Sequence, residues 1–585
     1  MFHLYAAGVS PFTALVQRPV HWALMAVLAY LGVGVRRRSA GKISLVVAAA
    51  SIGAAIAAGA YMVAVHHQLV ARAGASTPLD LVMGALAVVV TLELARRTSG
   101  WGLVSVALLA ITYAFAGPYL PGLLAHGGYG ARRLIEHLYL STEGIWGVPL
   151  GVSADFVYLF VLFGAVLDAG GGGKLLIALS SKIAGSSVGG PAKTASVASA
   201  LMGSLSGSAV ANVVTTGTLT IPVMKRTGFK PHFAAAIEAA ASTGGQLMPP
   251  VMGAGAFILA TWTNIPYTRV AVAAAIPAVL YYVALFMAIH LRARKMNVAV
   301  TPTEADATLS RIHLLLPLAV IVLFLGLGRS PMRAAFWGVV TAAAMTLIAK
   351  STRLDWPKAR GALVAAASGT VQVAAACAAA GIVVGVASLT GIGLRMSQVI
   401  VTLSGGHLPI ALLLTAIGSV LLGMGLPTTA AYVVLAALGA PALTQLGVPL
   451  LAAHLFIFYY GALSNITPPV ALAAYSAAGI ADAPPLKTAS AAVALAAAGF
   501  VVPFAFVYGP PLLLDGSLLQ VLGATVTAAL GVTALAAATI GYGRRTLVAW
   551  ERAVLLAAGV ALMLPDLVSN VVAGSVGSII LVRKS

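Results

Sequence analysis

Long apolar stretches recur along the whole chain and constrain its fold more than any other feature. Of the 585 residues, 60% are hydrophobic and only 8% are charged. An ordinary soluble domain carries about a quarter charged residues, and about 20 apolar residues suffice to cross a bilayer as a helix. The composition therefore predicts an all-α polytopic membrane protein. It excludes a cytosolic enzyme and a nucleic-acid-binding module, and the single cysteine, Cys377, excludes a secreted disulfide scaffold.

The basic residues lie mainly in short loops between the apolar runs, and they indicate the orientation in the membrane. The chain has 34 Lys and Arg against 14 Asp and Glu, a formal net charge of +20. If Arg36 to Arg38 lie in the cytoplasm, alternating crossings place most other basic residues there too, including Arg96 and Arg97. Cytoplasmic loops of membrane proteins carry this excess. The positive charge therefore reports topology, and we expect no nucleic-acid partner.

An internal repeat relates two segments, about 192–262 and 411–481. At one constant offset, Pro222 aligns with Pro441, Gly228 with Gly447, and Pro249-Pro250 with Pro468-Pro469. An odd number of predicted crossings separates the copies, so they enter the membrane from opposite sides. Inverted repeats whose apolar segments are interrupted by Gly or Pro at matching places indicate a secondary transporter with its binding site at the membrane midplane.

Each copy contains two interrupted segments. The stretches 192–223 and 408–443 are broken near their middles by Gly and Pro, and we expect them to form re-entrant hairpins. The segments that follow contain Pro-Pro pairs and are predicted to be discontinuous helices, because proline lacks an amide proton and clashes with the preceding turn. Unwound carbonyl groups can bind a small cation, and freed amides at helix N-termini suit a carboxylate. The alternative is that Gly and Pro merely kink packed helices.

Small polar residues at the hairpin tips and helix breaks are the candidate ligands. One cation site is predicted from Ser206, Ser208, Asn212, Ser242, Thr243 and Gly245. A second is predicted from Gly425, Thr428, Thr429, Ser464, Asn465 and Thr467. The substrate is expected between the tips, at Gly207, Ser208, Gln246, Pro427, Thr428 and Asn465. No arginine is evident for that cavity, so helix dipoles and hydroxyl groups would bind most of an anion's charge.

Glu238 is the clearest carboxyl group inside a predicted crossing. An ionisable side chain is costly there and is a functional candidate by default. Glu238 precedes Ser242 by about one helical turn, and its counterpart in the second copy is Ile457. Three roles remain open for this carboxyl group: carrying a coupling proton, adding charge to a sodium site, or forming a protonated structural contact. We expect no cofactor and no catalytic residue.

The repeat segments resemble the large membrane subunit of tripartite ATP-independent periplasmic (TRAP) transporters. The similarity is carried by SGSAVANVVTTGTLTIPVMKRTGF and EAAASTGGQLMPPVMGAGAFI, and by GMGLPTTAAYVVLAALGAPAL and GALSNITPPVALAAYSAAGIA. These strings look most like the fused form that works with TAXI-type binding proteins. That resemblance implies a small-subunit-like four-helix scaffold in residues 1–140 and a large-subunit-like transport and scaffold region in 141–514. Residues 515–585 would be additional transmembrane helices.

The resemblance also implies a function. It predicts an elevator-type permease in the bacterial inner membrane that receives a small organic acid from a soluble periplasmic binding protein. Uptake would be coupled to a sodium gradient, or to protons, since Glu238 matches a carboxylate of the TAXI-type branch. An ATP-binding-cassette importer permease is the main alternative; it would need a partner ATPase and would lack the inverted repeat. A membrane enzyme or respiratory antiporter subunit would need several ionisable residues along the midplane.

Overall fold

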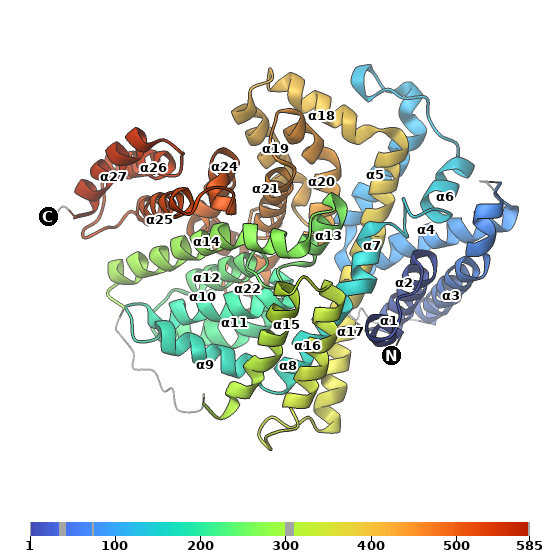
Figure 1. Cartoon of the computed structure of the whole chain (residues 1–585), viewed down its shortest axis with the longest axis horizontal. Coiled ribbons are helices and arrows are strands. Elements are labelled where there is room, and N and C mark those ends of the chain that lie inside the picture. Colours follow the sequence, from blue (N-terminus) through green and yellow to red (C-terminus); the bar gives the residue numbers. More distant parts are fainter. Residues whose placement is uncertain (1, 34–41, 73–74, 299–308, 583–585) are drawn as a thin grey trace.

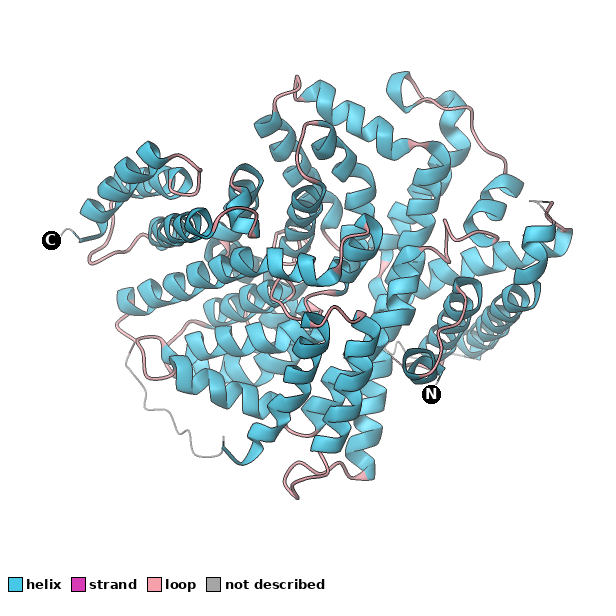
Figure 2. Cartoon of the chain, viewed as in Figure 1, coloured by secondary structure: helices cyan, strands magenta, loops and turns pink. Residues whose placement is uncertain are grey.

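The computed structural model describes residues 2–33, 42–72, 75–298 and 309–582. Within these residues the chain forms helices joined by loops, apart from one isolated bridge between Tyr542 and Thr546 (Figure 2). Nine helical segments in the described part of the chain are long and apolar enough to cross a membrane. The predicted all-α polytopic fold is therefore confirmed.

The N-terminal region packs six α-helices and two short 3-10 turns beside the rest of the molecule (Figure 1). Helix α4 begins sharply because Thr77 and Asp80 cap each other's main chain, and it ends in Arg96 and Arg97 before Gly100, whose φ is +83°. The elements are α1 (Phe2–Gly8), α2 (Ala14–Tyr30), α3 (Lys42–Ala71), α4 (Pro78–Ser99), α5 (Trp101–Ala116), η1 (Gly117–Tyr119), η2 (Gly122–Leu124) and α6 (Ala131–Tyr139).

The first copy of the repeat follows, preceded by helices α7 and α8, which pack against the long helix α17 (Trp356–Thr390). The elements are α7 (Val148–Val152), the π-helical turn η3 (Ser153–Val157), α8 (Tyr158–Ala169), α9 (Gly172–Ala184), α10 (Gly190–Ser206), α11 (Ala209–Arg226), α12 (Pro231–Gly245), α13 (Ala254–Thr263) and α14 (Tyr267–Lys295). Helices α10 and α11 fold back on each other as a hairpin. Helices α12 and α13 are two halves separated by the Pro249-Pro250 break.

The second copy has the same order. Helices α19 and α20 form the second hairpin, and α21 and α22 are separated by Pro468-Pro469; both Pro-Pro bonds are cis. The elements are η4 (Leu309–Leu315), α15 (Leu316–Gly326), α16 (Pro331–Met345), α17 (Trp356–Thr390), α18 (Ile392–Leu403), α19 (Leu408–Gly423), α20 (Thr428–Gln445), α21 (Leu450–Leu463), α22 (Leu472–Ala481), α23 (Pro485–Leu495), α24 (Ala497–Tyr508), η5 (Pro510–Leu513), α25 (Leu518–Ile540), α26 (Ala549–Ala561) and α27 (Leu567–Val582).

The second halves of the broken helices are exchanged between the copies. Helix α22 packs against α11 and α12 of the first copy, and α13 packs against α20 and α21 of the second (Figure 1). Lys225 at the end of α11 donates a 2.9 Å hydrogen bond to the carbonyl of Ala481 in α22. The two copies are therefore interlocked, and each break is followed by a half-helix that packs on the opposite copy.

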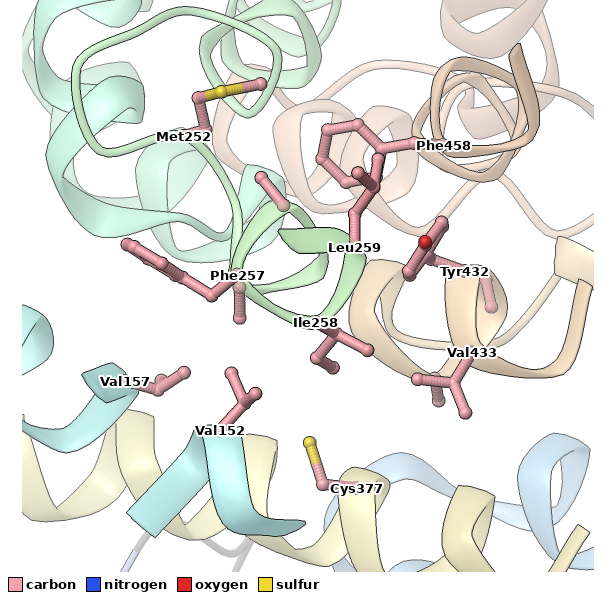
Figure 3. Close-up of a cluster of buried hydrophobic side chains, with 14 of the residues drawn as sticks. Val152, Val157, Met252, Phe257, Ile258, Leu259, Cys377, Tyr432, Val433 and Phe458 are labelled. Atoms are coloured by element: carbon pink, nitrogen blue, oxygen red, sulfur yellow. The ribbon is translucent and has the colours of Figure 1, made fainter. Parts of the chain in front are cut away.

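Helix α13 is held by a dense apolar cluster. Its residues Phe257 and Ile258 face Val152 and Cys377 on one side, and Leu259 faces Phe458 on the other (Figure 3). All of these side chains are buried. Burying apolar surface at this density fixes the half-helix against both α17 and the second copy. Cys377 is thus a packing residue.

The closest approach of α10 to α12 depends on two glycines, and it generates a stability prediction. A Cβ atom on Gly203 would lie 2.7 Å from the Cα of Gly245. We expect Gly203→Ala to lower the stability of the folded protein by about 1–3 kcal/mol, because the helices cannot separate without losing other contacts. Thermal unfolding of the detergent-solubilised protein measures this loss.

The matched control is Gly53→Ala in α3, where an added Cβ has no atom within 4 Å. That variant should unfold within about 1 kcal/mol of the parent protein. Equal stability of the two variants would contradict the close packing of α10 on α12.

Candidate functional site

The tips of the two hairpins meet inside the molecule. In the first hairpin, α10 ends at Gly207, whose φ of +65° is readily adopted by glycine, and Ser208 caps α11 by accepting from the amide of Ala211 at 3.4 Å. In the second, Gly425 has a φ of +81° and Pro427 precedes the first residue of α20. Both turns are small and polar, as the sequence predicts.

The two helix breaks are closed in the same way. In the first copy the amide of Gly253 donates to the carbonyl of Gln246 at 2.8 Å, and in the second the amide of Ala473 donates to the carbonyl of Asn465 at 3.0 Å. Gln246 and Asn465 occupy equivalent positions of the repeat. Their main chains close the unwound loops, which leaves their side chains free to reach the hairpin tips.

A chain of hydrogen bonds joins the tips and breaks of the two copies. The Gln246 amide nitrogen donates to the carbonyl of Gly207 at 3.1 Å. The Thr428 hydroxyl donates to the Gln246 side-chain oxygen at 2.9 Å, and the Asn465 amide nitrogen donates to the Thr428 hydroxyl oxygen at 2.9 Å. Four of the predicted substrate-binding residues therefore form one continuous network across the repeat.

All six predicted substrate-binding residues line one cavity. The cavity has a volume of about 660 Å³, and Ser208 and Pro427 lie in its wall beside the hydrogen-bonded network. Arg96 and Arg97, from the end of α4, also line it. The expectation that no arginine serves this cavity is therefore wrong, because the repeat segments do not build it alone. The N-terminal region supplies part of the wall.

The first predicted cation set is brought together by three helices. Ser206 comes from α10, Asn212 from α11, and Ser242, Thr243 and Gly245 from α12. The side-chain oxygens of Ser206, Asn212 and Thr243 are buried without a hydrogen-bond partner among the described residues. Hard cations prefer such oxygen ligands. Ser206 and Ser208 line the cavity, whereas the other four residues lie behind its wall.

The second predicted cation set is divided. Thr428, Thr429 and Asn465 line the cavity, whereas Gly425, Ser464 and Thr467 do not. The Ser464 hydroxyl lies 3.1 Å from the carbonyl of Gly423, and the Thr467 hydroxyl donates to the carbonyl of Leu463 at 2.9 Å. Both hydroxyl protons are thus used by the main chain. Cation binding by either set stays a prediction.

Glu238 lies at the centre of a buried cluster of hydroxyl groups. One of its carboxyl oxygens accepts from Ser199 at 2.5 Å, from Thr216, and from Ser242 at 3.3 Å. The other accepts from Thr220 at 2.5 Å. Glu238 is fully buried, and it forms no ion pair within the described residues. Burial without a cationic partner disfavours the charged form, whereas donated hydrogen bonds favour it.

The hydroxyl groups around Glu238 have alternative acceptors. Thr216 lies 2.8 Å from the carbonyl of Asn212, and Thr220 lies 3.0 Å from the carbonyl of Thr216. Each hydroxyl can therefore turn from the carboxyl group to the main chain and accept a proton instead of donating one. The cluster can satisfy both protonation states of Glu238.

The hydroxyl partners of Glu238 exist in the first copy alone, and the sequence analysis missed three of them. The repeat alignment could have identified them, because each of these polar residues aligns with an apolar residue or a glycine in the second copy. In order, Ser199, Thr216, Thr220, Glu238 and Ser242 align with Gly418, Leu435, Gly439, Ile457 and Gly461. Thr216 and Thr220 are also four residues apart, which places them on one face of α11.

Comparison with known proteins agrees with this architecture. The family model described as "Tripartite ATP-independent periplasmic transporter, DctM component" matches residues 86–521. A putative TRAP transporter large permease protein of Haemophilus influenzae is 30% identical over 169 residues, which are 28% of this chain and 39% of that protein.

Two further relatives match a shorter and a longer stretch. A C4-dicarboxylate TRAP transporter large permease protein of Pseudomonas aeruginosa is 32% identical over 143 residues, 24% of this chain and 33% of the relative. An uncharacterized protein of Sinorhizobium fredii is 29% identical over 221 residues, 34% of this chain and 52% of the relative. The chain thus spans about half the length, or less, of these curated relatives.

The cavity predicts which positions a water-soluble thiol reagent can reach. In a Cys377→Ala background, which lacks cysteine, we expect Ser208→Cys to react rapidly with a charged maleimide added to inside-out vesicles. The reason is that Ser208 lines the cavity together with Arg96 and Arg97, which the topology predicted from the sequence places on the cytoplasmic side. Labelling is measured as the fraction of protein modified against time.

Ser242→Cys is the matched control, because Ser242 is fully buried and lies outside the cavity wall. It should remain unmodified until the protein is unfolded. Equal labelling of both positions, or labelling of Ser208→Cys from the periplasmic side alone, would contradict this cavity.

Proposed function

Because this chain belongs to the DctM component family of tripartite ATP-independent periplasmic transporters, we propose that it is the permease of a secondary transporter for a small organic acid. It is a multi-pass protein of the bacterial inner membrane. The proposal includes a soluble periplasmic binding protein as the source of substrate, a cation gradient as the driving force, and an elevator movement. It also includes fusion of a small subunit, residues 1–140, to a large one, and a TAXI-type binding partner.

The hydrogen-bonded network at the hairpin tips carries this proposal. Since Gln246 links Gly207 of one tip to Thr428 of the other, the hairpins and broken helices can move as one body with a bound solute. A cavity of about 660 Å³ has the size of a small-molecule site. The relative from Pseudomonas aeruginosa bears the name of a C4-dicarboxylate permease, which supports a small carboxylate as the substrate.

Glu238 is our candidate for coupling the movement to an ion gradient. The hydroxyl groups with alternative main-chain acceptors favour a proton, because they can stabilise both protonation states. The unpartnered oxygens of Ser206, Asn212 and Thr243 favour a bound sodium ion close to the same helices. These observations support a direct role for this copy of the repeat in coupling, and the experiments below separate the two ions.

An uptake experiment tests the proposed function. Right-side-out vesicles that contain the full chain are supplied with periplasmic extract from the source cells and with radiolabelled succinate, as a C4-dicarboxylate probe, together with other small acids. Accumulation should follow an imposed sodium or proton gradient in the absence of ATP. Uptake that needs ATP and ignores both gradients would instead favour an ATP-binding-cassette importer.

Asn465→Ala should weaken this uptake without unfolding the protein. The substitution removes the 2.9 Å bond to Thr428 and therefore uncouples the second break from the tips. A hydrogen bond of this kind contributes about 0.5–1.5 kcal/mol, so the half-saturating cation or substrate concentration should rise roughly twofold to tenfold. Wild-type concentration dependence for both solutes would remove Asn465 from the site.

Glu238→Gln should separate the possible roles of the carboxyl group. Glutamine keeps the shape. Its oxygen can accept from Ser199 while its NH2 group donates to the Thr220 hydroxyl, which can turn its own proton to the carbonyl of Thr216. Glutamine cannot, however, gain or lose the proton. If Glu238 carries the coupling proton, gradient-driven uptake should be lost while exchange of labelled for unlabelled solute continues. If it serves a sodium site, the sodium requirement should rise with little change in pH dependence.

The matched control for this variant is Ile457→Leu at the equivalent position of the second copy, which preserves an apolar side chain. It should retain driven uptake. Glu238→Gln that behaves like this control at every pH and sodium concentration would leave Glu238 with a structural role only.

A further inference from the structure

The corner between α4 and α5 belongs to the cavity wall although it lies outside both repeats. Residues from Arg96 to Gly100 line the cavity that also contains the hairpin tips. Helix α5 continues directly from this corner to the second tip, because a Cβ atom on Gly102 would lie 3.1 Å from the carbonyl oxygen of Gly425. The N-terminal region therefore stands beside the expected path of the substrate.

The corner carries one positive charge in excess. The Glu93 carboxylate neutralises Arg96 by accepting two hydrogen bonds from it. One comes from the Arg96 Nε at 2.6 Å and the other from an Arg96 terminal nitrogen at 2.8 Å. Arg97 shares the same carboxylate through its Nε alone, at 2.7 Å. One carboxylate thus serves two guanidinium groups, and Arg96 takes the bidentate position.

The guanidinium of Arg97 is held in place while its outer edge remains available. Its central carbon lies 4.7 Å from the ring centroid of Tyr30, an attractive cation–π contact. Its two terminal nitrogens make no hydrogen bond to the residues that the structure describes. The side chain is 20% exposed. A planar fork of two donors matches the two oxygens of a carboxylate.

The other polar groups of the cavity wall favour the same direction for an anion. Asp168, at the end of α8, also lines the cavity, and its carboxylate repels a second one. The polar side chain that α17 contributes to the wall is the neutral amide of Gln372. An acid that leaves the hairpin tips is therefore attracted towards the α4–α5 corner.

We propose that Arg97 receives a carboxylate of the substrate at the cytoplasmic mouth of the cavity. The N-terminal region then takes a direct part in substrate release and in the preference for acids, beyond supporting the transport machinery. This inference rests on the proposed function, since it assumes a carboxylate substrate. It concerns a different residue and a different region from the hairpin-tip network.

Protection from labelling tests the proposal without the periplasmic partner. Inside-out vesicles contain the full chain with two substitutions. Cys377→Ala removes the native cysteine, and Ser99→Cys places a thiol at the α4–α5 corner. Succinate should slow maleimide labelling of this thiol, and succinamide, its uncharged analogue, should not. The succinate concentration that gives half-maximal protection is the measured quantity.

Arg97→Gln should raise that concentration about tenfold or more, because it removes the charge from a charge-assisted hydrogen bond. Arg97→Lys should raise it less, since lysine keeps the charge but loses the fork. Glu93 keeps its bidentate partner Arg96 in both variants, so the corner should remain folded. Arg329→Gln, which removes an exposed arginine outside this cavity, should leave protection unchanged.

Two results would overturn the proposal, and they differ in their consequence for the proposed function. Unchanged protection by succinate in Arg97→Gln, with intact succinate uptake, would exclude Arg97 as a carboxylate ligand and leave the proposed function standing. Failure of succinate and of every other small acid to protect the parent protein, together with absent uptake, would remove both the carboxylate substrate and this role of Arg97.

Discussion

Unwound backbone can exist at the depth of a membrane only when protein covers it or when it lines a water-filled cavity, and this constraint organises the whole molecule. The two helix breaks satisfy it first locally, by returning an amide to the carbonyl of Gln246 or Asn465. The exchange of α13 and α22 adds further cover, because the half-helix after each break packs against the opposite copy. Because the main chains are closed in this way, the side chains of these two residues can meet the hairpin tips.

The two copies share their backbone plan but not their buried chemistry. The first copy surrounds Glu238 with four hydroxyl groups, whereas the second has Ile457 at that position. The second copy has a polar pair of its own, in which the Tyr432 hydroxyl lies 2.8 Å from His454. Duplication thus explains the paired hairpin tips and helix breaks, while only one of the two copies has an acid within its repeat segment. Such an asymmetry is compatible with one coupling event in each transport cycle.

Sequence patterns predicted the hairpins, the helix breaks and six of the residues that line the cavity, because Gly, Pro and the repeat act locally on the backbone. The partners of Glu238 were harder to find, since Ser199 and Thr220 become its neighbours only when α10 and α11 pack on α12. Arg97 was assigned to the cytoplasmic side by counting alternate crossings from Arg36 to Arg38, and no ligand role was predicted for it. Its place in the cavity depends on how α4 and α5 pack beside the second hairpin, which no local pattern specifies.

The exchange of half-helices also has a consequence for biosynthesis. A ribosome completes α11 and α12 long before it reaches α22, the segment that covers them in the finished fold. The small and polar side chains of the first copy therefore remain without this cover, in contact with lipid, water or another protein, until most of the chain has been inserted. Membrane insertion machinery that shields such segments would act as a temporary substitute for α22.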